Sequence, residues 1–234
     1  MSSSESTSQV QKTPLLVLLS GSGTNFAALL RATETPANPL SSLATITHVI
    51  SNRKSAYGLT RARDANIPTT YHNLQTGGYS KKHPNDPAKA REEYDHDLAD
   101  IILALDPRPE VIVCAGWMHI LSPAFLNPLE QAGIEIINLH PALKGEFDGI
   151  DAIGRAYIAF KEGKITRTGV MVHRVIAAVD QGPLVLQQEI PILEDDTKES
   201  LEERIHGVEW EVIVEGTTRV VKERRENKEK GLIA

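Results

Sequence analysis

Ile134-Glu-Ile-Ile-Asn-Leu-His-Pro-Ala-Leu143 is the stretch around which the rest of the chain can be arranged. Its first half is a short apolar run typical of a buried strand, and its second half carries an amide and an imidazole where that strand ends. Asn138 and His140 are two residues apart, so their side chains leave an extended backbone on the same face, and Pro141 keeps His140 extended.

In open α/β sheets, ligands bind at the carboxyl ends of the strands, where paired donors can stabilise an oxygen that gains negative charge. Asn138 and His140 would form such a pair. The same residues also fit a plainer interpretation, in which an Asn ends the strand and a packed His precedes a turn.

The rest of the chain alternates apolar runs with amphipathic segments, as an α/β domain does. Strands are expected at residues 15–19, 44–50, 67–71, 111–115, 134–140, 168–177 and 184–188, and helices at 26–30, 58–65, 89–105, 150–161 and 198–224. Helices between successive strands imply right-handed crossovers and a Rossmann-like, mostly parallel twisted sheet flanked by helices. Loops are expected at 34–42 and 76–87, and a solvated charged run at 222–230.

Length and composition limit the classes of protein that this chain can represent. Its 234 residues, with 41% hydrophobic and 24% charged, suit one α/β domain, and the net charge of -6 argues against nucleic acid as the main partner. No apolar run approaches the ~18 residues of a membrane span. Because Cys114 is the one cysteine, an internal disulfide and a cysteine metal cluster are excluded. Its apolar neighbours predict that Cys114 is buried. Residues 1–14 are interpreted as the disordered tail of a cytoplasmic protein.

Ser20-Gly-Ser-Gly-Thr-Asn25 links the first aliphatic run to a helix and predicts an anion-binding loop. Free backbone N–H groups and the positive end of the helix dipole would point at one spot. The loop lacks the Lys of a Walker A loop, and Phe26 replaces the third glycine of a dinucleotide-binding loop, so a single phosphate is the better fit. The alternative is a glycine-rich turn in which Thr24 or Asn25 only caps the helix.

Val179-Asp-Gln-Gly-Pro183 places a carboxylate at the end of a predicted strand, beside a Gly-Pro turn. Asp180 is therefore well placed to enter a cleft. The plainer interpretation, in which Asp180 only initiates the turn, is the commoner case.

Five separated segments together resemble the phosphoribosylglycinamide formyltransferase family, the stand-alone folate-dependent enzymes of purine synthesis. The segments are Leu18-Leu-Ser-Gly-Ser-Gly-Thr-Asn25, Ile50-Ser-Asn-Arg53 with Gly58-Leu-Thr-Arg-Ala62, Ala115-Gly-Trp-Met-His-Ile-Leu-Ser-Pro-Ala-Phe125, Ile137-Asn-Leu-His-Pro141 and Val179-Asp-Gln-Gly-Pro183. Each is weak alone, whereas five in colinear order are highly specific. The resemblance implies a formyltransferase fold with a C-terminal antiparallel addition.

The resemblance also implies how the chain is divided. A single formyltransferase domain would span residues 15–214, with a phosphate-binding part at 15–105 and a folate-binding and catalytic part at 106–214. Residues 215–234 would form a charged C-terminal helix or tail.

Particular residues fall on the family's functional positions. The catalytic positions are Asn138, His140 and Asp180; the phosphate loop is Gly23, Thr24 and Asn25; and the acidic residue that contacts the sugar hydroxyls is Glu209. The folate positions are Arg91, the apolar loop of Met118, Ile120 and Leu121 with His119 among them, and Val179 and Gln181 in the facing loop.

The implied reaction transfers a formyl group from 10-formyltetrahydrofolate, a co-substrate, to the amine of glycinamide ribonucleotide. Asn138 and His140 would donate to the oxygen that gains charge as the amine attacks. Asp180 would hold the imidazolium and help to carry a proton, through water, to the departing folate nitrogen. No metal and no covalent enzyme intermediate is required. Both a monomer and a homodimer are compatible with the sequence.

Several positions depart from the usual family wording but leave these three residues intact. His119 stands where many members have Arg, Val170 replaces a usual Thr, and His206 replaces a polar or basic residue. The segments after Pro141 also differ, as Ala142-Leu-Lys-Gly145 and Ile150-Asp-Ala-Ile153.

Three rival functions follow from the same residues. A formyl-folate hydrolase would pass the formyl group to water, and another transferase would use an amino sugar or methionyl-tRNA. The tRNA enzyme would need a further domain and a basic surface, which an acidic chain of this length lacks. A non-catalytic nucleotide-sensing module would predict the loss of Asn138, His140 or Asp180, and all three are present.

Overall fold

A computed structural model of the chain describes residues 11–233, and its centre is a seven-stranded sheet. The strands are β1 (Thr13–Leu19), β2 (Ala44–Ser51), β3 (Thr69–Tyr71), β4 (Val111–Cys114), β5 (Glu135–His140), β6 (Arg167–Arg174) and β7 (Leu184–Pro191). They lie in the order β3-β2-β1-β4-β5-β6-β7; the first five are parallel, and β6 and β7 pair antiparallel with their neighbours. The mostly parallel sheet with an antiparallel end is therefore confirmed.

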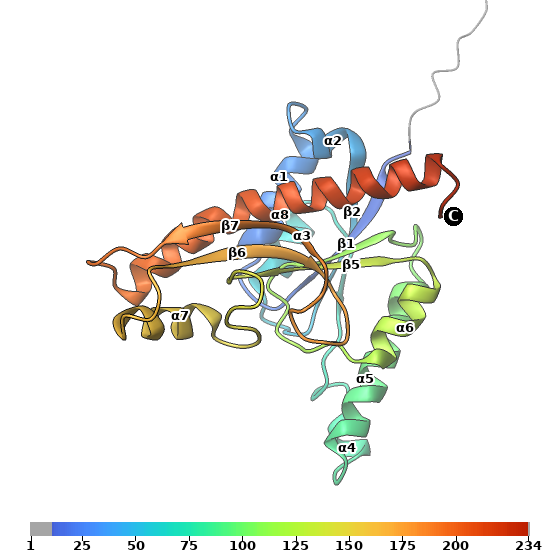
Figure 1. Ribbon diagram of the computed structural model, residues 1–234. Helices are drawn as coiled ribbons and strands as arrows, with labels where there is room; N and C mark the ends of the chain where they lie inside the picture. The colour runs from blue at the N-terminus through green and yellow to red at the C-terminus, as the bar shows by residue number, and fades with distance from the viewer. Residues whose placement is uncertain (1–10, 234) are drawn as a thin grey trace, which may run out of the picture.

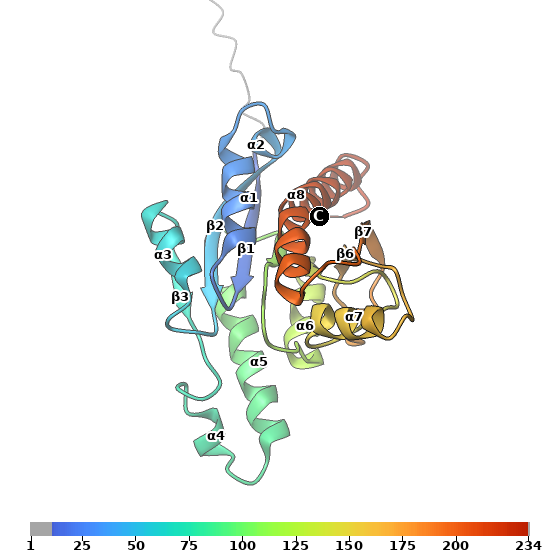
Figure 2. The ribbon, with the colours of Figure 1, turned by 90° about the vertical axis from the view of Figure 1, so that its left-hand side faces the viewer.

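Helices cover both faces of this sheet (Figures 1 and 2). They are α1 (Thr24–Glu34), α2 (Pro39–Leu43), α3 (Tyr57–Asp64), α4 (Tyr79–Lys82), α5 (Pro87–Leu103), α6 (Pro123–Gln131), α7 (Ala152–Lys161) and α8 (Lys198–Glu229). Apolar side chains of α1, α3, α7 and α8 share one hydrophobic cluster with the sheet, and those of α5 and α6 share the other. Within residues 11–233, the structure has no helix with the length and apolar character needed to cross a membrane.

Strand β1 lies in the middle of the sheet and is buried on both faces. Leu15, Val17 and Leu19 belong to the cluster under α1 and α8, whereas Leu16 and Leu18 belong to the cluster under α5 and α6. All five side chains are fully buried. A strand covered on both faces has this unbroken aliphatic sequence, which explains why β1 could be recognised from the sequence alone.

Three helices occupy stretches where the sequence analysis placed none. α2 lies at the end of the expected loop 34–42, α4 lies within the expected loop 76–87, and α6 fills the connection between β4 and β5. The side chain of Asn38 accepts a hydrogen bond from the Leu40 N–H at 2.9 Å, and Pro39 is the first helical residue. Pro and Asn, which suggested a loop by composition, here start a helix.

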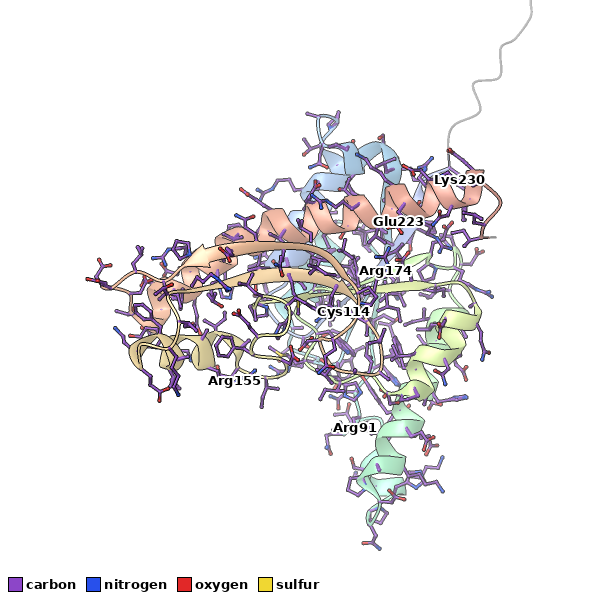
Figure 3. The ribbon with its side chains drawn as sticks, viewed as in Figure 1. Arg91, Cys114, Arg155, Arg174, Glu223 and Lys230 are labelled. Carbon is purple, nitrogen blue, oxygen red and sulfur yellow. The ribbon has the colours of Figure 1, made fainter. Side chains whose placement is uncertain are left out.

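Arg174, the last residue of β6, joins two strands to α8 (Figure 3). Its Nε lies 2.6 Å from Glu135 Oε1 on β5, and its Nη2 lies 2.8 Å from Glu223 Oε2 on α8. Because β6 ends at Arg174, it is three residues shorter at this end than expected.

Cys114 is 2% exposed in β4, as expected, and burial raises the pKa of its thiol to about 12.

The end of α8 differs from the solvated charged run expected at 222–230. α8 is one helix of 32 residues, and the side chain of Arg224 within it is 9% exposed. Arg224 Nε and Lys228 Nζ each lie 2.8 Å from Glu110 Oε2, just before β4. The expectation is wrong for Arg224, which is buried against a distant carboxylate, whereas Lys228 pairs with the same carboxylate and stays 36% exposed.

Gly23 and Gly58 bring the loop after β1 against α3. A Cβ on Gly58 would lie 2.6 Å from Leu19 Cδ2 and 3.2 Å from Gly23 Cα. The Gly58 N–H also donates to the Gly21 carbonyl at 3.1 Å. The loop after β1 is therefore held by close backbone packing that a side chain would disturb.

We expect Gly58→Ala to destabilise the protein although Ala favours helices over Gly by about 1 kcal/mol. Overpacking against the fully buried Leu19 costs about 1 to 3 kcal/mol, so after the gain in helix propensity the unfolding free energy should fall by about 1 kcal/mol, and by at most about 2 kcal/mol. Urea unfolding measures this change. Gly21→Ala is the matched control, because a Cβ there meets nothing within 4 Å of the described atoms. Equal stability of the two variants would contradict the prediction.

Candidate active site

Asn138, His140 and Asp180 meet at the carboxyl end of β5. Asn138 and His140 belong to β5, and Asp180 belongs to the connection between β6 and β7. The Asn138 amide donates to Asp180 Oδ1 at 3.3 Å, and His140 Nδ1 lies 3.4 Å from Asp180 Oδ2. His140 is 5% exposed and Asp180 is 9% exposed. The three residues expected to act together therefore form one polar group, in which His140 and Asp180 are buried and Asn138 is half-buried.

A second histidine, His173, completes this group and was not identified from the sequence. The antiparallel register pairs His173 of β6 with Asn138 of β5. His173 Nε2 lies 3.2 Å from both Asp180 Oδ1 and Asn138 Nδ2, and the residue is 2% exposed. A His within a predicted strand, seven residues before Asp180, was the available signal. Only the register between β5 and β6 shows that it faces Asn138.

The chain that follows β5 contacts the same group. His140 Nε2 lies 3.2 Å from the Phe147 carbonyl oxygen, and the Gly149 N–H donates to Asp180 Oδ2 at 2.8 Å. Phe147 has a φ of +50°, a left-handed conformation that costs a non-glycine residue about 1 to 2 kcal/mol. Arg155 of α7 also donates to the Phe147 carbonyl and so stabilises this conformation.

These hydrogen bonds determine which ring nitrogens carry protons. A carbonyl oxygen only accepts, so His140 Nε2 must donate to Phe147, and His173 Nδ1 must donate to the Arg174 carbonyl at 2.9 Å. The nitrogen of each ring that faces Asp180 therefore carries a proton only when the ring is an imidazolium. Asp180 thus lies beside two nitrogens that can take up a proton.

Burial and hydrogen bonding shift the pKa values of this group in opposite senses. Burial lowers the pKa of His140 below its usual 6.5, against the raising effects of Asp180 and the Phe147 carbonyl. Burial would raise the pKa of Asp180, but the two neighbouring histidines and the hydrogen bond from the Gly149 N–H outweigh burial and hold this pKa below 3.8. At neutral pH the group therefore consists of an ionised Asp180 beside a neutral His140.

The turn that carries Asp180 is closely fitted to β6. A Cβ on Gly182 would lie 1.7 Å from the Arg174 carbonyl oxygen, so only glycine fits there. Lys144, one of the departures from the family wording, donates from Nζ to the Gly182 carbonyl at 2.6 Å and lies 3.5 Å from the Asp180 carbonyl. Lys144 thus ties the segment after β5 to the turn.

Gly23, Thr24 and Asn25 lie where β1 leads into α1. Gly23 is the N-cap with a φ of +70°, and the N–H groups of the first helical turn have no acceptor within the helix. No side chain within residues 11–233 caps α1, so the alternative of Thr24 or Asn25 as a cap is wrong. The Asn25 amide instead donates to Glu209 Oε2 of α8 at 3.1 Å. Glu209 is 7% exposed, and burial raises its pKa.

Residues 118–121, expected to contact folate, point in two directions. Met118 and Ile120 are 70% and 50% exposed, whereas Leu121 is 8% exposed and packs in the cluster with α5 and α6. His119 turns inward, with Nε2 2.6 Å from Asp95 Oδ1 of α5. The structure therefore places only Met118 and Ile120 with their side chains outward.

The remaining expected folate residues lie on two separate elements. Arg91 lines a cavity of about 540 Å³ between the first turns of α5 and α6, together with Ser122. Val179 and Gln181 flank Asp180 in its turn. Val179 is 37% exposed, and Gln181 Nε2 lies 3.4 Å from Asp148 Oδ2. Ser122, which lines this cavity together with Arg91, directly follows Leu121 in the chain.

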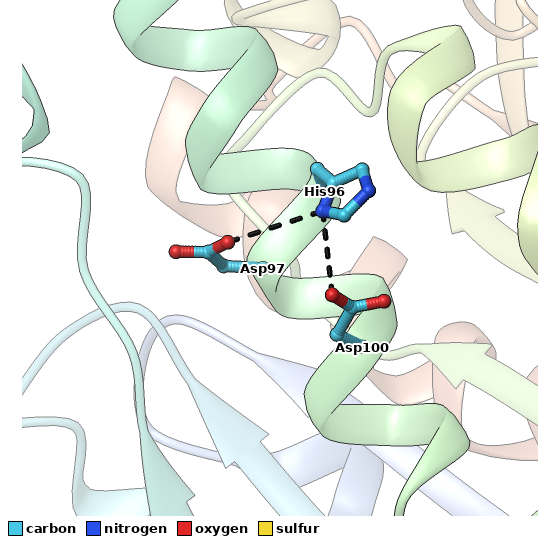
Figure 4. A group of neighbouring side chains, drawn as sticks. All are labelled: His96, Asp97 and Asp100. Carbon is cyan, nitrogen blue, oxygen red and sulfur yellow. Dashed lines mark ion pairs between the residues drawn. The ribbon is translucent and has the colours of Figure 1, made fainter.

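His96, Asp97 and Asp100 form a small cluster on the outer face of α5 (Figure 4). His96 Nδ1 lies 3.4 Å from Asp100 Oδ2 and 3.9 Å from Asp97 Oδ1. Their side chains are 47% to 63% exposed, so water competes for every group. We assign the cluster to surface ion pairing.

Comparisons with known proteins identify the family of this chain. Residues 14–217 match the formyl transferase family. The chain is 51% identical to phosphoribosylglycinamide formyltransferase of Schizosaccharomyces pombe over 207 residues, which is 88% of this chain and 96% of that protein. It is 33% identical to the Escherichia coli enzyme of the same name over 195 residues, covering 83% of this chain and 81% of that protein.

Solved structures show the same relation. Glycinamide ribonucleotide transformylase 1 from Symbiobacterium toebii matches with a TM-score of 0.75 at 30% identity, over 93% of this chain and 94% of that chain. The family match covers most of the chain, the identities extend over nearly whole relatives, and the fold agrees. This chain therefore belongs to the formyl transferase family.

Proposed function

We propose that this protein transfers the formyl group of 10-formyltetrahydrofolate to the primary amine of glycinamide ribonucleotide, a step of purine synthesis. The observation that carries the proposal is the polar group of Asn138, His140, His173 and Asp180, in a chain 51% identical to a protein named for this reaction. The amine nitrogen bonds to the formyl carbon, the bond from that carbon to N10 of the folate breaks, and a proton passes from the amine to N10.

Asn138 and His140 are the donors for the oxygen of the tetrahedral adduct. Both lie at the end of β5, and burial of His140 keeps this region at low dielectric, where such donors act strongly. In the free protein the Nε2–H of His140 is donated to the Phe147 carbonyl. The more negative oxygen of the adduct is a stronger acceptor for that same N–H.

Asp180 controls the proton that leaves the amine. His140 Nδ1 faces Asp180 and is unprotonated in the neutral ring. The negative charge of Asp180 favours protonation of this nitrogen when the attacking amine loses its proton. The imidazolium formed in this way is a better donor to the adduct and is the source of the proton for N10. The Asn138 amide donates to the opposite oxygen of Asp180, which keeps the carboxylate aligned with His140.

The two substrates would bind at opposite ends of this group. At one end, the first turn of α1 offers backbone N–H groups to the phosphate, and Glu209 beside Asn25 accepts hydrogen bonds from the ribose hydroxyls. At the other end, Met118 and Ile120 cover the pterin ring. The cavity at Arg91 then takes the carboxylates of the folate tail. Holding both substrates in attack geometry supplies much of the acceleration.

The first test is whether tetrahydrofolate is released from 10-formyltetrahydrofolate only when glycinamide ribonucleotide is present. We expect His140→Ala to lower kcat by about 100- to 1,000-fold, because it removes one oxyanion donor. His96→Ala, which removes a 63% exposed histidine of α5, is the matched control and should keep full activity. Release without the ribonucleotide would indicate a hydrolase instead, and folate binding without turnover would indicate a different acceptor.

We expect acid to destabilise the protein in part through His140. The pKa of folded His140 lies below 6.5. As the pH is lowered from 7.5 to 5.5, the unfolded state therefore takes up more protons than the folded state, and the unfolding free energy decreases. For one group this effect is at most about 1.4 kcal/mol per pH unit. His48 and His72 also have lowered pKa values and act in the same direction.

Comparison with His140→Gln isolates the contribution of His140. The variant should lose less unfolding free energy than the wild type over that pH range, as measured by urea unfolding at each pH. An identical loss would show that His140 does not take up its proton in this way.

We expect Glu209→Gln to weaken ribonucleotide binding selectively. The amide keeps the hydrogen bond from Asn25 but loses the charge that strengthens hydrogen bonds from ribose hydroxyls. The KM for glycinamide ribonucleotide should rise about tenfold, while the KM for the folate stays unchanged. Steady-state kinetics with each substrate varied in turn measures both values, and an equal rise in both would argue against this placement of the ribose.

A further inference from the structure

Asp95 is a fully buried carboxylate on α5 whose two partners both lie in one loop. Its Oδ1 lies 2.6 Å from His119 Nε2, and its Oδ2 accepts a hydrogen bond from the Ser122 N–H at 2.9 Å. Asp95 is 0% exposed and the His119 side chain is 9% exposed. A buried carboxylate is costly unless it is hydrogen-bonded, and here residues 119–122 supply those hydrogen bonds.

The other end of the same loop is tied to the chain that follows β1. The Ser20 N–H donates to the Gly116 carbonyl at 3.0 Å, and the Met118 N–H donates to Ser20 Oγ at 2.8 Å. Ser20 Oγ in turn donates to Asn52 Oδ1 at 2.7 Å. The segment 116–122 is therefore held at both ends by groups on other elements.

This anchoring determines which side chains the loop presents. Because Asp95 draws His119 inward, the neighbouring Met118 and Ile120 point outward, 70% and 50% exposed. The His119 ring also packs edge-on against the Tyr94 ring, with centroids 5.0 Å apart. Two large apolar side chains are thus held in water on an anchored backbone, which is the arrangement of a preformed binding surface.

We propose that Asp95 is a positioning residue for the folate: through His119 and Ser122 it fixes the loop that places Met118 and Ile120 against the pterin ring. The inference rests on the proposed function. The anchoring lowers the entropy lost when folate binds, because the loop is ordered before the ligand arrives. Its effect should fall on the folate and not on the ribonucleotide, because Asp95 holds residues 119–122, whereas Ser20, beside the phosphate loop, holds the other end of the segment at Gly116 and Met118.

Three variants test the role of Asp95. Asp95→Ala removes both hydrogen bonds, and the KM for 10-formyltetrahydrofolate should rise about tenfold or more, while the KM for glycinamide ribonucleotide changes less than about twofold. His119→Phe keeps the packing on Tyr94 but removes one hydrogen bond, and should raise the folate KM about threefold to fivefold. Asp95→Asn should be within about twofold of wild type, because its amide can accept from Ser122 and donate to His119 Nε2.

Asp100→Ala is the matched control. It removes a carboxylate from the same helix, but this carboxylate is 63% exposed and pairs only with His96 among the described residues. Its kinetics should equal those of the wild type. If Asp95→Ala does not fold, the pair His119→Phe and Asp95→Asn still decides the question.

Trp117 lies inside the loop and reports its order without any turnover. The protein has two tryptophans, so a Trp210→Phe parent leaves Trp117 as the single emitter. In that parent, Asp95→Ala should increase quenching of Trp117 by acrylamide, Asp95→Asn should not, and bound tetrahydrofolate should reduce the difference. Tetrahydrofolate binding by calorimetry should weaken in parallel with the increase in KM.

Two results would overturn the inference. Equal rises in the KM values of both substrates, or unchanged Trp117 quenching in Asp95→Ala, would mean that Asp95 serves only the stability of the fold. A wild-type protein that binds tetrahydrofolate but does not formylate glycinamide ribonucleotide would instead refute the proposed function, while the binding and quenching results would still test Asp95.

Discussion

The buried carboxylate of Asp180 is the group on which the arrangement of the site depends. Taking a charge out of water is favourable only when polar groups surround it, and here they come from separate parts of the chain: the Asn138 amide of β5 and the Gly149 N–H donate to it, and His173 of β6 lies beside it. The antiparallel pairing of β5 with β6 brings them to one place. The antiparallel end of the sheet therefore positions the residues of the proposed active site as well as completing the fold.

Much of the fold could be predicted from the sequence because parallel strands buried on both faces have unbroken aliphatic runs. β1 and β4 are such strands, and all seven strands were placed within a few residues. α2 and α4 were missed because one-turn helices have too few residues for a periodic pattern. The charged end of α8 was misread because its pairing with Glu110 joins residues 114 apart in the sequence.

The candidate site could be predicted where the residues follow a local motif, and not where they depend on register or side-chain direction. Asn138, His140 and Asp180 lie in recognisable segments and do come together. His173 could not be found, because strand register is not visible in one sequence. His119 was expected beside the folate, and nothing in its local sequence shows that Asp95 turns it inward. Lys144 was noted only as a departure, and its contact with the Gly182 carbonyl needed the folded chain.

Helix α8 connects parts of the molecule that would otherwise be far apart. Along about 22 Å of helix axis it carries both Glu209, at the proposed ribose site, and Arg224, paired with Glu110 directly before the central strand β4. Between them, Glu223 pairs with Arg174 at the end of β6. Helix α8 thus contacts both the antiparallel end of the sheet, through Arg174, and the proposed phosphate loop, through Asn25. We therefore expect the two halves to lose their structure in a single cooperative transition, with no state in which one half of the site persists alone.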